Sequence, residues 1–144
     1  MSTYVDTSIW VAALCNEAAT AAVQEWLADQ SRGDLAVSDW VITEFSSALS
    51  LKIRTGQITP EHRADALREF KHLLSVSLLT FHISPEDFHT AARLADMHQS
   101  GLRAGDALHL ATCANQGHTL ATLDKTLATT ATQLGVAIRN PNSE

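Results

Sequence analysis

Long apolar runs are missing from this sequence. No stretch of its 144 residues approaches the roughly 20 consecutive apolar residues that a membrane-spanning helix needs. A basic segment followed by an apolar one, as in a secretory leader, is absent from the start. Cysteine is scarce, since Cys15 and Cys113 are the only two and form no CxxC pair. These features predict two reduced core thiols in a cytoplasmic protein that does not associate with membranes.

An excess of positive charge is missing as well. Ten Lys and Arg residues stand against sixteen Asp and Glu residues, which gives a formal net charge of −6. That balance argues against a protein that grips nucleic acid with a large basic surface. If nucleic acid is the substrate, metal ions or a local basic patch must offset the phosphate charge. Positive residues cluster modestly in one region, where a solvated helix surface is the ordinary interpretation: Lys52, Arg54, Arg63, Arg68 and Lys71.

Several signatures of catalysis and nucleotide binding are absent. The seven histidines show neither an HExxH motif nor another paired spacing of zinc ligands. No GxGxxG run, and no GxxxxGK run followed by Ser or Thr, is present to cradle a nucleotide. The GxSxG turn of serine hydrolases is missing too. The sequence therefore gives no support to a zinc protease, a nucleotide-binding protein or a serine hydrolase.

The sequence does contain an alternation of short apolar strands and longer helical segments. Strands are expected at residues 3–6, 35–38, 77–83, 118–123 and 136–140, and the segments between them are long enough to be helical crossovers. This order predicts an α/β fold with a parallel, helix-covered sheet. Because no linker, repeat or low-complexity segment interrupts the chain, we expect one domain over residues 1–140 and a frayed tail at residues 141–144.

The helical segments carry boundary and burial signals. Thr59–Pro60 and Ser84–Pro85 each place a capping hydroxyl before a proline at the first helical position. In the helix expected after residue 38, the apolar residues that recur at helical spacing are Ile42, Phe45, Leu49 and Ile53.

Acidic residues occur where sites form in sheets of this kind. Asp6 and Asp124 follow strands, while Glu44 and Asp106 lie in the first turns of helices. Because the carboxyl ends of parallel strands share one edge, we expect all four near a change in strand order at that edge. Four carboxylates repel one another, so a hard divalent cation such as Mg²⁺ or Mn²⁺ is the natural compensation. Such a cluster is suited to activating water for in-line attack on a phosphate.

Each acid taken alone has a simpler interpretation. Asp6 and Asp124 could serve only as helix caps, and Asp106 could serve only to support a helix dipole. Glu44 could face solvent. Their agreement on one edge of the sheet is what carries the prediction.

Other polar side chains lie near these acids. Thr7 or Ser8 could bind a phosphate or a metal-bound water, and Thr122 shares a strand face with Asp124. Ordinary capping and strand propensity explain these residues equally simply. His109 could be a general base, although a polar helix position is its simpler interpretation.

Four segments together resemble the signature blocks of a known family. "YVDTSIWVAAL", "SDWVITEFSSAL", "LRAGDALHLATCA" and "LATLDKTLA" are similar, in order and spacing, to those of PIN-domain ribonucleases, in particular VapC-type toxins of toxin–antitoxin pairs. The resemblance implies a PIN-like three-layer α/β/α sandwich with a central, mainly parallel sheet of about five strands. It also implies a metal-dependent endoribonuclease that forms a homodimer, cleaves RNA and is inhibited by a cognate VapB-like antitoxin, whose C-terminal segment enters the site.

The resemblance also implies residue roles. The catalytic residues and the ligands of Mg²⁺ or Mn²⁺ would be Asp6, Glu44, Asp106 and Asp124. Residues at the substrate would be Thr7, Thr122 and Arg103, although Arg103 could equally be an ordinary surface arginine. Gly105 departs from the family pattern, because a bulkier residue or proline is more usual there and glycine weakens a helix start.

Two other functions compete with the nuclease. A noncatalytic RNA-binding or protein-interaction module could share the fold, but a scaffold has no reason to carry the electrostatic cost of converging acids. A phosphotransfer receiver domain would need paired acids after the first strand and a suitably placed late lysine, and the sequence offers neither. Hydrophobic stripes could supply the dimer surface, and the residues that could fill either that surface or the core are Trp10, Trp26 and Trp40.

Overall fold

Five parallel strands form the centre of the protein. The computed structural model describes residues 2–143. The strands are β1 (Thr3–Val5), β2 (Leu35–Ser38), β3 (Leu79–Phe81), β4 (Thr119–Ala121) and β5 (Ile138–Arg139). They lie in the order β3-β2-β1-β4-β5, and every pairing is parallel. The expected sheet is confirmed, with shorter strands than the sequence predicted at four of the five positions.

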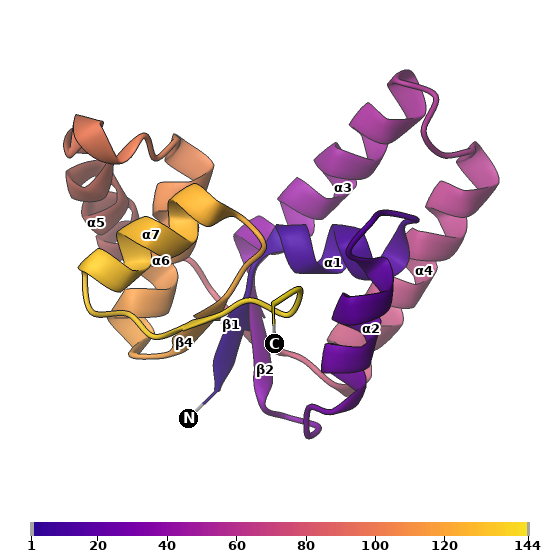
Figure 1. Cartoon of the computed structure of the whole chain (residues 1–144), viewed down its shortest axis with the longest axis horizontal. Helices are drawn as coiled ribbons and strands as arrows, with labels where there is room; N and C mark the ends of the chain where they lie inside the picture. The colour runs from indigo at the N-terminus through magenta and orange to yellow at the C-terminus, as the bar shows by residue number, and fades with distance from the viewer. Residues whose placement is uncertain (1, 144) are drawn as a thin grey trace.

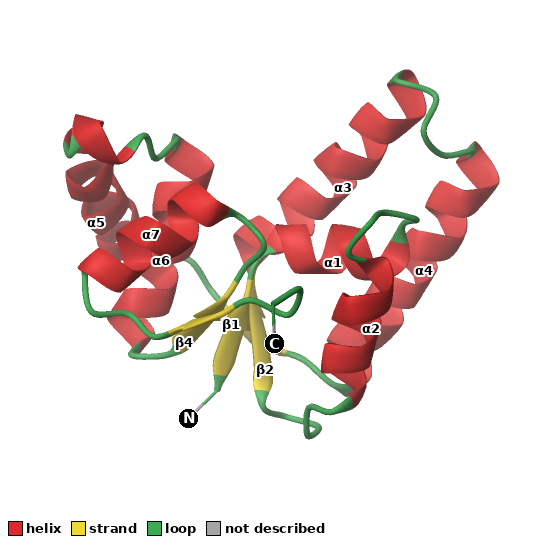
Figure 2. Ribbon diagram, in the orientation of Figure 1, coloured by secondary structure: helices red, strands yellow, loops and turns green. Residues whose placement is uncertain are grey.

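Helices cover both sides of this sheet. The first group is α1 (Thr7–Leu14), α2 (Thr20–Ala28), α3 (Asp39–Arg54) and α4 (Pro60–Val76). The second is α5 (Pro85–Asp96), α6 (Ala104–Gln116) and α7 (Lys125–Gln133), with a short 3₁₀ turn at His98–Ser100. Figures 1 and 2 show the two groups on opposite sides of the sheet, with α3 and α4 projecting as a long hairpin. The arrangement is the expected α/β/α sandwich.

Local capping explains where two of these helices begin. The Thr59 side chain accepts a hydrogen bond from the His62 backbone N–H at 3.1 Å, with Pro60 at the first position of α4. Ser84 and Asp87 form a reciprocal capping box at the start of α5. Gly101, in the left-handed region at φ 73°, ends the 3₁₀ turn, which allows the chain to reverse into α6.

The main core cluster extends over both sides of the sheet, from α1–α4 to α6 and α7. Trp10 and Trp26 are both buried there, so they do not supply a dimer surface. On α3 the buried residues are Val41, Phe45 and Leu49. The expectation that Ile42 faces the core is wrong, because its side chain is 38% exposed. The buried stripe advances strictly by four residues from Val41, which turns the neighbouring position outward.

The remaining expectations concern cysteines, membranes and the tail. Cys15 and Cys113 are buried and form no disulfide. Within residues 2–143, no helix combines the length and apolar character needed to cross a membrane. Of the expected tail at residues 141–144, Glu144 lies outside the described part of the chain, and residues 141–143 form a turn.

The strand order sets the position of a site. From β1 the chain moves outward through β2 and β3, then returns to place β4 on the other side of β1. The carboxyl ends of β1 and β4 therefore flank the point where strand order reverses, which is the usual place for a binding site in open parallel sheets. Val5 pairs with Ala121 at this edge, and Asp6 N–H donates to the Ala121 carbonyl at 3.1 Å.

Candidate active site

An acid-lined cavity of about 560 Å³ opens at this edge of the sheet. Its lining includes all four acids singled out in the sequence, Asp6, Glu44, Asp106 and Asp124. They come from four places: the β1–α1 junction, the first half of α3, the first turn of α6 and the end of the β4–α7 connection. The structure thus brings together residues separated by more than a hundred positions, while their catalytic and metal-binding roles stay predictions.

Asp6 is the most deeply buried of the four, at 3% exposure. Its Oδ1 accepts a hydrogen bond from the Ser8 hydroxyl at 2.5 Å, and its Oδ2 accepts one from the Thr122 hydroxyl at 2.5 Å. Burial raises the pKa of Asp6, although the charge of His109 and these hydrogen bonds act in the opposite direction. The carboxyl group is therefore fixed in place but costly to ionise.

Thr122 holds two acids instead of facing the cavity. Its side chain is completely buried. The Thr122 hydroxyl accepts a hydrogen bond from the Asp124 backbone N–H at 3.0 Å and donates one to Asp6. Asp124 is the N-cap of α7, since its Oδ1 accepts from the Leu127 N–H at 3.0 Å. Asp124 thus combines capping with a place on the cavity, and Thr122 is placed to position acids, while its contact with substrate stays a prediction.

Glu44 is held by two donors on the same oxygen. The Thr7 hydroxyl donates to Oε1 at 2.6 Å, and His109 Nε2 lies 2.5 Å from that oxygen. Burial by itself would raise the pKa of Glu44, but the hydrogen bond and charge of His109, with the Thr7 hydrogen bond, bring it below its usual value. Metal ions are thus not the only compensation for the acids, because the protein supplies its own for Glu44.

His109 belongs to a buried chain that the sequence did not reveal. It is 1% exposed, and its Nδ1 lies 2.7 Å from the Tyr4 hydroxyl, which in turn lies 2.8 Å from the Ser38 hydroxyl. The chain links β1, the end of β2, α6 and, through Glu44, α3. Two weak signals pointed to it: Tyr4 shares a strand face with Asp6 at spacing two, and His109 follows Asp106 by three positions. Neither signal names a partner.

Gly105 and Asp106, at the start of α6, both lie close to Glu44. Burial and then the neighbouring carboxylates, chiefly Asp124 and also Glu44 and Asp6, raise the pKa of Asp106, while His109 opposes them. A Cβ placed on Gly105 would lie 3.0 Å from Glu44 Oε2 and 3.3 Å from the Trp40 ring. The departure from the family pattern at this position therefore leaves the room that Glu44 occupies.

Arg103 lies apart from these groups. It is an exposed residue at the N-cap of α6 and does not line the acid cavity. Of the residues lining the cavity that the sequence did not single out, the polar ones are Ser47 and Glu17. Glu17 forms an ion pair with Lys52 at 2.8 Å.

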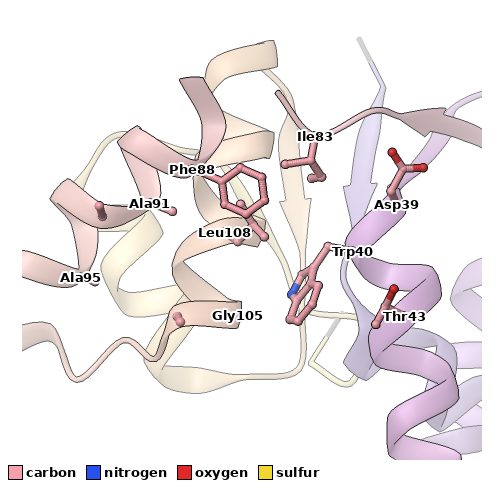
Figure 3. A pocket seen from close by; sticks show the side chains of 11 residues that line it. Asp39, Trp40, Thr43, Ile83, Phe88, Ala91, Ala95, Gly105 and Leu108 are labelled. Atoms are coloured by element: carbon pink, nitrogen blue, oxygen red, sulfur yellow. The ribbon is translucent and has the colours of Figure 1, made fainter. Parts of the chain in front are cut away.

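An apolar groove of about 680 Å³ adjoins the acid cavity. Figure 3 shows the Trp40 and Phe88 side chains facing this groove from α3 and α5, with Leu108 of α6 beside them. Gly105 lines the groove and the next residue, Asp106, lines the acid cavity, so the start of α6 separates the two. Phe88 is 55% exposed, which is unusual for so large an apolar side chain.

The donor set of the acid cavity fits a hard cation. Its potential ligands are carboxylate and hydroxyl oxygens, which suit Mg²⁺ or Mn²⁺. Within residues 2–143, no three side chains of His, Cys, Asp or Glu are arranged to ligate one ion together. Mg²⁺ keeps several waters and binds through one or two carboxylates, so this arrangement fits a largely hydrated ion. The mutual repulsion that raises the pKa of Asp106 is the feature that a cation would relieve.

Fold and cavity together define a parallel α/β protein with an acidic, oxygen-rich site at its switch point. The PIN domain family matches residues 3–133, and the chain belongs to that family. The family resemblance seen in the sequence is thereby confirmed. A search of curated protein sequences finds no match.

Solved structures share the fold over almost the whole chain. The FitAcB structure from Neisseria gonorrhoeae is 20% identical, with 96% of this chain and 97% of that one covered and a TM-score of 0.72. VapC20 from Mycobacterium tuberculosis, described as a sarcin–ricin loop cleaving toxin, is 19% identical over 89% and 94%, with a TM-score of 0.71. VapBC2 from Rickettsia felis, bound to a promoter DNA fragment, is 21% identical over 97% and 98%, with a TM-score of 0.66.

Proposed function

We propose that this protein is a metal-dependent endoribonuclease and the toxin of a toxin–antitoxin pair. The observation that carries the proposal is the convergence of Asp6, Glu44, Asp106 and Asp124 on one cavity at the switch point of a PIN-family fold. The raised pKa values of Asp6 and Asp106 support it, because groups costly to ionise concentrate at functional sites.

The protein's own residues would orient the reacting groups. A bound Mg²⁺ or Mn²⁺ at the cluster of Asp6, Glu44, Asp106 and Asp124, contacting one or two of these carboxylates and otherwise keeping its own waters, would supply Lewis acidity for an attacking water and for the phosphate. Ser8 and Thr122 fix both oxygens of Asp6, and Thr7 and His109 fix one oxygen of Glu44. The Glu44 Oε2 is left free of these hydrogen bonds. Rigid placement of this kind lowers the reorganisation that the reaction requires.

RNA as substrate and an antitoxin as partner are supported by similar structures. One similar protein carries the description of a toxin that cleaves the sarcin–ricin loop, and others were solved as VapBC or toxin–antitoxin complexes. The acid cavity would attract a basic segment of an inhibitor, as it would attract cations, since the chain carries a formal net charge of −6. We place the protein and its antitoxin in the cytoplasm, because Cys15 and Cys113 are buried thiols that form no disulfide.

A homodimer is also part of the proposal. Trp10 and Trp26 are in the core, but Trp40 and the exposed Phe88 line the apolar groove beside the acid cavity. An exposed apolar surface of this kind is typical of protein interfaces. We therefore assign the groove to contact between two copies of the chain, which sedimentation of the protein in solution would test.

The decisive experiment is RNA cleavage by purified protein with Mg²⁺ or Mn²⁺, with and without EDTA. Wild type should cleave only with the metal, and Asp6→Asn should lose at least about a hundredfold in rate, the scale of removing one electrostatic catalytic group. Asp96→Asn is the matched control, because Asp96 is an exposed acid outside the cavity. Equal cleavage by wild type and Asp6→Asn would overturn the assignment and favour a noncatalytic module.

A further inference from the structure

A second polar cavity lies on the hairpin formed by α3 and α4. It has a volume of about 430 Å³ and is lined by Ser50, Ile53, Arg54, Pro60 and Arg63. The first three residues belong to the last turns of α3, and the other two to the first turn of α4. Two arginine residues thus line one hollow on a protein with a formal net charge of −6.

Within residues 2–143, neither Arg54 nor Arg63 forms an ion pair. The basic side chains that do so in this part of the protein are Lys52, Arg68, His82 and His109. Arg63 Nη2 donates to the Ser50 hydroxyl at 3.2 Å, which orients the guanidinium, but its Nε is buried without a hydrogen-bond partner. The unpaired Nε is shielded from the cavity, so the groups available to an anion there are the remaining N–H groups of the guanidinium that Ser50 holds in place.

The two arginines, and not the N-terminus of α4, carry the preference for an anion. Pro60 has no N–H, Thr59 accepts from the His62 N–H, and Glu61 in the first turn already places a negative charge at that end of the helix. Planar guanidinium groups match phosphate oxygens through paired hydrogen bonds.

One stripe of α3 connects this cavity to the acid cavity. Ser47 lines the acid cavity, whereas Ser50 and Arg54 line the basic one. Positions 47, 50 and 54 follow the i, i+3, i+7 spacing of a single helix face. At 1.5 Å per residue, Ser47 and Arg54 are separated by about 10 Å along the helix axis. A flexible polyanion in the acid cavity could therefore continue along this face of α3.

We infer that the Arg54–Arg63 cavity binds a phosphate of the same RNA strand whose scissile phosphate lies at the acids. This inference rests on the proposed nuclease function. The separation of about 10 Å corresponds to about three nucleotides of a stacked strand at 3.4 Å each. The cavity also meets the requirement raised by the acidic composition, that a local basic patch offset the phosphate charge away from the acids.

The test compares Arg63→Gln and Arg54→Gln with Arg68→Gln, a matched loss of charge at an exposed residue that pairs with Asp65. Binding of a labelled single-stranded RNA is followed by anisotropy in an Asp6→Asn background across a salt series. Each cavity variant should weaken binding about tenfold, as expected for a charged hydrogen bond, and Arg68→Gln should not. The slope of log affinity against log salt should fall by about 0.7 for each lost contact.

Cleavage separates this inference from the nuclease assignment. With a long RNA, Arg63→Gln should raise KM about tenfold and leave kcat unchanged, because it removes binding remote from the reacting bond. A dinucleotide substrate, too short to reach the second cavity, should be cut equally by Arg63→Gln and wild type. Failure of wild type to cleave any RNA would overturn the nuclease assignment and, with it, this inference.

If wild type cleaves RNA but Arg63→Gln and Arg54→Gln match Arg68→Gln in affinity and salt slope, the phosphate site is refuted while the nuclease stands. Weakened binding of an acidic antitoxin segment with unchanged RNA affinity would also refute it, and would identify a carboxylate as the ligand. Circular dichroism of each variant confirms folding, and Arg63→Lys, which keeps the charge but loses the planar fork, should show an intermediate affinity.

Discussion

Gly105 shows at the scale of a single residue how the absence of a side chain serves the site. Glycine at the first turn of α6 weakens the helix by up to about 1 kcal/mol relative to alanine. From the sequence alone, this glycine was therefore expected only to weaken the start of the helix. In the structure, a Cβ at this position would press on Glu44 Oε2 and on the Trp40 ring. Gly105 therefore lowers the local stability of α6 but leaves the space that the Glu44 carboxylate occupies at the cavity.

We therefore expect Gly105→Ala to lower kcat/KM for RNA by about tenfold or more, the cost of a displaced reacting group. Its free energy of unfolding should change by less than about 1 kcal/mol, because better helix propensity offsets the crowding. Steady-state cleavage and urea unfolding would measure the two effects. If the alanine acts through Glu44, the double variant with Glu44→Gln should be no worse than Glu44→Gln alone. Additive losses would contradict this explanation.

At the scale of elements, side-chain hydrogen bonds join β1, β2, α3 and α6 at the site. Tyr4, Ser38, Glu44 and His109 each come from a different element. The bounds of these elements followed from local signals such as capping and hydrophobic spacing. Their mutual contacts did not, because hydrogen bonds over 34 to 105 positions are decided by packing.

His109→Phe should therefore destabilise the protein by about 1–3 kcal/mol, since it leaves buried partners unsatisfied. The pKa of Glu44 should rise, because burial raises it and the two contributions of His109 that lower it are removed. Urea unfolding at neutral pH gives the stability change. Tyr4→Phe is the comparison, because it also leaves buried groups, His109 Nδ1 and Ser38 Oγ, without their partner but keeps the His109–Glu44 contact. It should therefore lower stability to a similar extent without raising the pKa of Glu44, and an unchanged Glu44 pKa in His109→Phe would rule out the histidine as the group that holds Glu44 ionised.

At the scale of the whole molecule, the clustering of the acids at one end of the sheet lowers the free energy of unfolding by an amount that depends on pH. The folded state raises the pKa of Asp6 and Asp106, so it binds protons more tightly than the unfolded chain there. By linkage, stability should fall as pH rises from the unfolded Asp value of about 3.9 through the raised folded values. Glu44 acts oppositely, and its contribution is lost as pH falls below about 4.3 through its lowered pKa.

We accordingly expect Asp106→Asn to stabilise the metal-free protein at neutral pH by about 0.5–2 kcal/mol, the usual range for relief of a functional strain. It should also flatten the fall in stability with rising pH. Thermal unfolding in EDTA across a pH series would measure both, with Asp96→Asn as the control. Added Mg²⁺ should raise the Tm of wild type more than that of Asp106→Asn, because binding stabilises the folded state. A less stable Asp106→Asn in EDTA would show that repulsion is not the dominant effect.

The sequence alone determined the order of strands and helices and the positions of the four acids at strand ends and helix starts. Those features depend on short-range periodicity and capping, which neighbouring residues carry. The support of Asp6 by Thr122, the contact of His109 with Glu44 and the space at Gly105 arise from packing between elements and were not predictable from neighbouring residues. The shared cavity of Arg54 and Arg63 arises in the same way. Such contacts join distant positions, and their geometry is set only when the helices pack on the sheet.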